Sequence, residues 1–193
     1  MKRIGLTGGI GVGKSTVARI FNEIGGVPTL DADQVARALR APGGRAEPLI
    51  LKRFNTTDRT QLREIITKDP LAKKDLEAIL HPLIQQISES EFKRLESESS
   101  GAPFLIYEAT LLIESGRAPD FDAILVVTAP LPDRLSRIMA RDGISKEASL
   151  ALIDSQMSDA DRLKVADYRI ENLGSLDDLK TQVRKTLDQI KAS

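Results

Sequence analysis

The strongest constraint on the fold lies in the first 24 residues, where an apolar run, a glycine-rich stretch and an amphipathic pattern follow one another. Residues 4–6 have the character of a buried strand, and the apolar positions between 17 and 24 repeat with the period of a helix. The stretch between them fits G-x-x-x-x-G-K-[ST], whose fixed positions are Gly8, Gly13, Lys14 and Ser15. Strand, glycine loop and helix are the context in which this pattern forms a phosphate-binding P-loop.

The chemistry of phosphate binding explains these residue types. Glycines let the backbone curl so that successive N–H groups point into one concavity, and the start of the helix adds free N–H groups and a positive dipole end. Lys14 would reach the β- and γ-phosphates, and the Ser15 hydroxyl would hold Mg²⁺. A glycine-rich turn that binds nothing would need neither. The expected binding residues are Gly8, Gly11, Val12, Gly13, Lys14, Ser15 and Thr16.

Acidic residues follow two predicted strands. Residues 27–30 and 104–109 are the apolar stretches, and ligands of open α/β sheets lie beyond the carboxyl ends of strands. We expect Asp33 to be functional and Asp31 to cap the helix that follows. Glu108 is a candidate Mg²⁺ carboxylate, and the alternative for it is an edge carboxylate in solvent.

The segment from 34 to about 100 changes in character, being charged and mainly helical. We predict helices at 34–40, 47–54, 60–67 and 70–96, with the last one broken at His81-Pro82. This is an insertion of the right size for a helical substrate domain. His81, the single histidine, is a weak candidate for a substrate contact, and its alternative is a packing or capping role.

A further apolar strand at 122–128 is followed by a helix over residues 131–142 that carries three arginines on one face. This face could reach a nucleotide, although we expect Arg134 to be solvated beside Asp133. Gly143 ends the helix, and Ser145 is expected to cap the next one. The helical hairpin at 143–160 is predicted to be a lid that excludes water from phosphoryl transfer. A strand at 168–172 and a last helix complete the chain; the sequence from Ser175 to Asp178 resembles a capping box that opens this helix, which runs to about residue 190.

The sum is an α/β/α sandwich with a five-stranded parallel sheet, the P-loop kinase architecture. We expect a nucleotide core (1–33, 103–142 and 161–193), a helical insert (34–102) and a lid (143–160).

The 28 basic and 28 acidic residues balance, which favours neither nucleic acid nor membrane as partner, and the lack of cysteine rules out thiolate chemistry. Without a signal-like or spanning apolar run, we expect a soluble cytoplasmic protein, monomeric or a small homo-oligomer.

With these residues in view, the sequence resembles the dephospho-CoA kinase family over its whole length. Seven short motifs carry the resemblance, and their order and combination are specific. They are the loop at 6–15, Asp31-Ala-Asp33 with its continuation to Arg37, Leu80-His-Pro-Leu-Ile84, Leu111-Leu-Ile-Glu114, Arg137-x-x-x-Arg141-Asp142-Gly143, Ser155-Gln156, and Ala166-Asp167 followed by Glu171-Asn-Leu-Gly174.

The resemblance implies transfer of the ATP γ-phosphoryl group to the ribose 3′-hydroxyl of dephospho-CoA, with Mg²⁺. It implies that Asp33 is the catalytic base, that residues 11–16 bind ATP, that Arg141 covers the ATP from the lid and that Asn172 lies near the adenine. Arg37 and His81 would lie near the acceptor, and Leu111 is a further candidate contact. The alternatives are another P-loop kinase for a small molecule or nucleoside monophosphate, or a nucleotide-binding regulatory protein.

Overall fold

The computed structural model describes residues 1–99 and 101–193. The chain forms two compact units, one built from Met1–Leu30 with Leu95–Ser193 and the other from Asp31–Arg94. The first unit contains the glycine loop, and the second is helical.

The described residues build one parallel sheet whose five strands follow the order β2-β3-β1-β4-β5. The strand bearing the glycine loop, β1, is central, and Ile4 pairs with Ile106 of β3 on one side and with Ala123 of β4 on the other. The strands are β1 (Lys2–Thr7), β2 (Thr29–Asp31), β3 (Phe104–Glu108), β4 (Ala123–Thr128) and β5 (Tyr168–Glu171). The parallel five-stranded sheet that the sequence predicts is therefore confirmed, with ends shifted by one or two residues.

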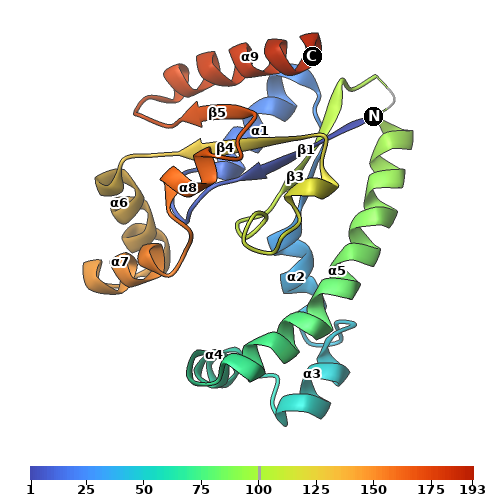
Figure 1. Cartoon of the computed structure of the whole chain (residues 1–193), viewed down its shortest axis with the longest axis vertical. Helices are drawn as coiled ribbons and strands as arrows, with labels where there is room; N and C mark the ends of the chain where they lie inside the picture. Colours follow the sequence, from blue (N-terminus) through green and yellow to red (C-terminus); the bar gives the residue numbers. More distant parts are fainter. Residues whose placement is uncertain (100) are drawn as a thin grey trace. The chain divides into compact units, whose positions relative to one another are not determined.

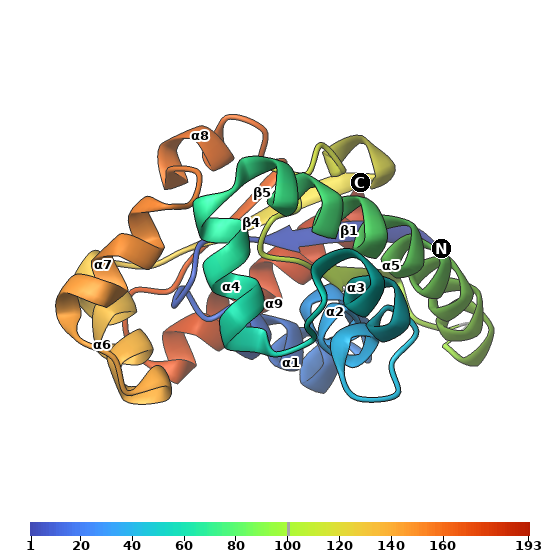
Figure 2. The same cartoon turned by 90° about the horizontal axis from the view of Figure 1, so that it is seen from below.

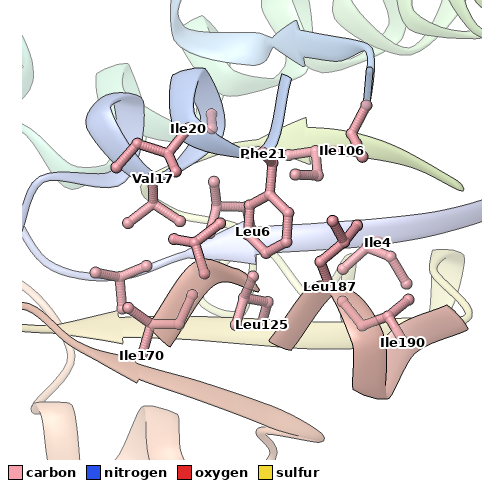
Figure 3. Packing of buried hydrophobic residues seen from close by; sticks show 14 of the residues in the cluster. Ile4, Leu6, Val17, Ile20, Phe21, Ile106, Leu125, Ile170, Leu187 and Ile190 are labelled. Carbon is pink, nitrogen blue, oxygen red and sulfur yellow. The ribbon is translucent and has the colours of Figure 1, made fainter. Parts of the chain in front are cut away.

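Two helices pack on one face of this sheet, α1 (Lys14–Gly25) and α9 (Leu176–Ala192). Figure 3 shows their apolar side chains meeting those of β1, β3, β4 and β5, with Phe21 beside Leu6 and Leu187. Phe21 also meets Phe104 edge to face, with 5.9 Å between the ring centroids. This apolar cluster holds β1 and the start of α1 in place. The two ends of the glycine loop between them are therefore fixed in position.

The opposite face is covered by the segment after β3 and by α8 (Asp159–Leu163). A methyl group added at Gly5 would lie 2.7 Å from Leu112 and 3.3 Å from the Phe121 ring, so this segment packs directly on β1. Tyr107 stacks on Phe121, with 5.0 Å between the ring centroids. A short 3₁₀ helix, η1 (Ala118–Asp120), lies within the segment.

Beyond β4, the chain forms α6 (Leu131–Asp142) and α7 (Lys146–Asp154), which lie side by side in Figure 2. Gly143 ends α6 in a left-handed conformation, and the Ser145 hydroxyl caps α7 by accepting from the Ala148 N–H at 3.2 Å. Both features agree with the sequence predictions, as does the Ser175 cap of α9. In the described part of the chain, no helix combines the length and apolar character that crossing a bilayer requires.

The helical unit contains α2 (Ala32–Arg40), α3 (Glu47–Phe54), α4 (Arg59–Lys68) and most of α5 (Pro70–Glu98). The three short helices gather along the N-terminal part of α5 (Figure 1). Their shared core is apolar and separate from that of the sheet, and its buried members are Leu39, Ala46, Ile50, Phe54, Leu62, Ala72, Leu76 and Leu80.

The predicted break at His81-Pro82 is wrong, because α5 runs through Pro82 without interruption. Proline removes one backbone N–H and crowds the preceding turn, which usually ends or kinks a helix. Here Leu80 before the proline and Leu83 and Ile84 after it pack on the same core of the helical unit. Burial on both sides of Pro82 outweighs the local cost.

Candidate active site

The glycine loop joins the carboxyl end of β1 to the first turn of α1, as its sequence predicts. Gly13 stands before the helix with φ at +96°, a left-handed conformation that favours glycine. Among the described residues, no side chain caps the first turn of α1, so its N–H groups remain available to an anionic ligand. The Val12 side chain is fully buried in the sheet core, which leaves that residue only its backbone for a ligand.

Lys14 lies largely buried at the start of this helix. Its Nζ donates to the carbonyl oxygens of Gly8 at 3.0 Å and Gly9 at 3.4 Å, so the ammonium group lies against the loop that it follows in sequence. An ammonium held against successive glycine carbonyls places a positive charge at the loop, as binding of a phosphate chain requires.

Ser15 and Glu108 come together from α1 and β3. The Ser15 hydroxyl donates to Glu108 Oε1 at 2.7 Å, and Glu108 is only 5% exposed. The alternative of an edge carboxylate in solvent is therefore wrong. A hydroxyl and a carboxylate in contact are hard oxygen donors, the type that Mg²⁺ prefers, and the pair fits a divalent cation shared with phosphate oxygens and water.

The arginines of α6 lie differently from expectation. Arg134 is 6% exposed, so the expected solvated side chain is wrong; its Nε donates to the Ile10 carbonyl at 2.9 Å and it pairs with Asp159 at 3.2 Å. Arg137 donates to the carbonyl oxygens of Gly11 at 3.1 Å and Val12 at 3.3 Å. Both of these arginines contact the backbone of the glycine loop.

Arg141, the third arginine of this face, is an exposed side chain paired with Asp142. The two groups form parallel hydrogen bonds of 2.7 Å, and these bonds raise the pKa of Arg141 above its usual value. The structure thus shows Arg141 in a local ion pair, and its contact with ATP stays a prediction.

Asn172 lies at the turn after β5 and is buried. Its side-chain amide donates to the Val12 carbonyl at 2.9 Å, and its backbone N–H donates to Thr128 at 2.8 Å. A methyl group at Gly13 would approach the amide nitrogen to 2.6 Å. Asn172 therefore holds the backbone of the glycine loop at Val12, while its predicted position near the adenine stays untested.

Sequence reasoning missed two residues that hold this region together. Gln156 accepts a hydrogen bond from the Ile10 N–H at 2.8 Å, and Arg162 is fully buried, with an ion pair to Glu114 and a 2.5 Å bond to the Met157 carbonyl. Gln156 belongs to the Ser155-Gln156 motif, but the motif by itself predicts no role for the glutamine side chain. For Arg162, a charged helical pattern cannot distinguish a solvated arginine from a buried one.

In the helical unit, Asp31 caps α2 by accepting from the Gln34 N–H at 2.9 Å, as predicted. Arg37 lies 3.9 Å from the Asp31 carboxylate. Asp33 is an exposed residue of the first turn of α2, and His81 is exposed on α5. Leu111, in the other unit, is 51% exposed. None of these positions tests the predicted roles, which stay predictions for Asp33, Arg37, His81 and Leu111.

A parallel sheet with a lysine- and hydroxyl-bearing glycine loop after its central strand defines the nucleotide core of a P-loop kinase. The family model described as dephospho-CoA kinase matches residues 2–178. The chain belongs to the dephospho-CoA kinase family, whose members phosphorylate dephospho-CoA with ATP, and it is accordingly a kinase of coenzyme A biosynthesis.

Individual relatives agree with this assignment. The dephospho-CoA kinase of Syntrophotalea carbinolica is 38% identical over 188 residues, which cover 93% of this chain and 88% of the relative. A solved structure of dephospho-CoA kinase from Campylobacter jejuni is 31% identical, with a TM-score of 0.67; the match covers 98% of this chain and 97% of the solved one. The protein TT1252 from Thermus thermophilus is 36% identical, with a TM-score of 0.83 and 97% of each chain covered.

Proposed function

We propose that this chain transfers the γ-phosphoryl group of Mg·ATP to the ribose 3′-hydroxyl of dephospho-CoA, with the ATP phosphates bound by residues 8–16. The observation that carries the proposal is the contact between Ser15 and buried Glu108, beside Lys14, at the carboxyl end of the sheet. A hydroxyl, a carboxylate and an ammonium group gathered at a helix start are the parts that phosphoryl transfer uses.

Positioning and charge neutralisation dominate this chemistry, because the transition state of phosphoryl transfer is loose and forms little new bonding. The N–H groups of residues 11–16 orient the phosphate chain, and Lys14 offsets negative charge on the β- and γ-phosphates. Ser15 and Glu108 would hold Mg²⁺, which neutralises charge on the phosphate oxygens when bound. Arg141 is proposed to cover the ATP from the lid side.

The helical unit is proposed to bind the acceptor, with Arg37 and His81 near it. Leu111 is proposed as an additional substrate contact. Asp33 is proposed to orient the 3′-hydroxyl and accept its proton, a role typical of a carboxylate at this place in the family motif. The hairpin at 143–160 is proposed to close as a lid that excludes water.

ADP release from Mg·ATP, measured with and without dephospho-CoA, tests this function. We expect ADP only with the acceptor, and a product that is heavier by one phosphoryl group and carries it on the ribose 3′-oxygen by mass spectrometry. Adenosine monophosphate and shikimate serve as control acceptors. ADP release that does not depend on dephospho-CoA, or that favours a control acceptor, contradicts the proposal.

A further inference from the structure

The two peptide groups that flank Ile10 in the glycine loop are each held by a residue from a distant part of the chain. Its N–H donates to Gln156 Oε1 at 2.8 Å, and its carbonyl accepts from Arg134 Nε at 2.9 Å. Arg134 lies in the first turn of α6, whereas Gln156 follows α7. The Gly9–Ile10 and Ile10–Gly11 peptides are therefore each fixed in orientation by one side chain, and the two side chains come from separate elements.

Two glycines at variable positions of the loop pattern fit around Arg134. The pattern fixes Gly8 and Gly13, but leaves positions 9 and 11 open. A methyl group at Gly9 would lie 2.3 Å from Arg134 Nη2, and one at Gly11 would lie 2.9 Å from the Arg134 carbonyl oxygen. A larger residue at Gly9 would therefore displace the Arg134 side chain, and one at Gly11 would meet the Arg134 backbone.

Arg134 makes these contacts from a buried position, which is costly for a cation. Burial lowers its pKa, and the neighbouring Asp159 carboxylate offsets part of that effect. Asp159 lies 3.2 Å from one Arg134 guanidinium nitrogen and 3.6 Å from Nη1 of Arg162. The loop is therefore connected, through the partly buried ion pair of Arg134 with Asp159, to the end of the predicted lid.

We propose that Arg134 and Gln156 are positioning residues for ATP, acting through the loop backbone by fixing the two peptide groups that flank Ile10. With those peptides fixed, the N–H groups that follow them keep their direction toward the phosphates. The inference rests on the proposed binding of ATP by residues 8–16. It gives Gly9 and Gly11 a role that the phosphate contacts alone do not require.

Gln156→Met tests the N–H side of this arrangement, because methionine keeps the approximate volume and removes the amide oxygen. Loss of one hydrogen bond of ordinary net strength corresponds to about 3- to 10-fold weaker ATP binding. We expect this rise in Kd by calorimetry, a matching rise in KM for ATP, a KM for dephospho-CoA within about twofold, and faster hydrogen exchange over residues 8–16. Gln189→Met, on the exposed side of α9, is the matched control and should change none of these.

A merely structural role for Gln156 would raise both KM values together and lower the melting temperature. That result, or unchanged ATP affinity in Gln156→Met, overturns the proposal. Because calorimetry needs no acceptor, it separates the two hypotheses: a native chain that does not bind Mg·ATP defeats the proposed function and this inference together, whereas equal binding by native and variant chains defeats only this inference.

A double-mutant cycle tests the carbonyl side. Gly9→Ala forces Arg134 away from the loop, so we expect it to weaken ATP binding about tenfold in the native background. In the Arg134→Ala background the same methyl group keeps an ordinary contact of 3.4 Å with Gln156 Oε1, so the substitution should cost less than about twofold, since contacting residues are non-additive. An equal cost of Gly9→Ala in both backgrounds would show that Arg134 does not set the requirement for glycine.

Discussion

The Ser15 hydroxyl donates a 2.7 Å hydrogen bond to Glu108, joining the first turn of α1 to the last residue of β3. The two residues are 93 positions apart in the chain, and parallel pairing of β1 with β3 brings them together, since Leu6 is in register with Glu108. The carboxylate at the end of the buried strand β3 thus contacts the serine hydroxyl of the glycine loop.

Replacing Glu108 with glutamine should raise the Mg²⁺ concentration needed for half-maximal activity by about 10-fold or more. Glutamine keeps an oxygen that can accept from Ser15, but it loses the negative charge that favours a divalent cation, and loss of a supporting group typically costs 10- to 100-fold in metal affinity. The measurement is a Mg²⁺ titration of initial rate at saturating ATP. Glu171→Gln, at the exposed end of β5, is the control, and an equal Mg²⁺ requirement in both variants would remove Glu108 from the metal site.

Replacing Asp33 with asparagine should lower turnover by about 10²- to 10⁴-fold, the usual contribution of a general base, and leave the Kd for ATP nearly unchanged. Steady-state kinetics and calorimetry measure the two effects separately. Asp31→Asn is the matched control, because asparagine can still cap α2 by accepting from Gln34. Near-normal turnover in Asp33→Asn would mean that another group accepts the proton.

Replacing Arg162 with alanine should destabilise the chain by about 3 kcal/mol, the low end of the range for breaking a buried ion pair. Arg162 is fully buried, whereas the Glu114 side chain is 21% exposed, so water recovers part of the loss. Urea unfolding followed by circular dichroism gives the free energy of unfolding. The same substitution in a Glu114→Gln background should cost clearly less; additive costs would show that the pair is not coupled.

Binding of both substrates should slow hydrogen exchange in residues 143–160, because lid closure orders the hairpin and shields its amides. The comparison is between the free chain and the chain with dephospho-CoA and a non-hydrolysable ATP analogue, measured by mass spectrometry of peptides. Peptides from α9 serve as the internal reference. Exchange in 143–160 that does not change with both ligands bound would count against a lid.

Short-range patterns in the sequence were sufficient for most of the elements. The alternation of apolar strands and helices led to the correct sheet, and the caps at Asp31, Ser145 and Ser175 appeared where predicted. These signals work because backbone hydrogen bonding and capping involve residues within a few positions of one another. Pro82 is the exception, because its helix is maintained by packing in the helical unit that local preference does not register.

The sequence by itself determined the glycine loop, its lysine and hydroxyl, and the family, because these depend on residue types in a fixed local order. Only the tertiary structure decided whether Glu108 is buried on Ser15 or lies in solvent, and that Arg134 reaches the Ile10 carbonyl 124 positions away. The physical reason is that a charged side chain has the same local pattern in water and in a protein interior. Its environment depends on which distant strands and helices pack around it.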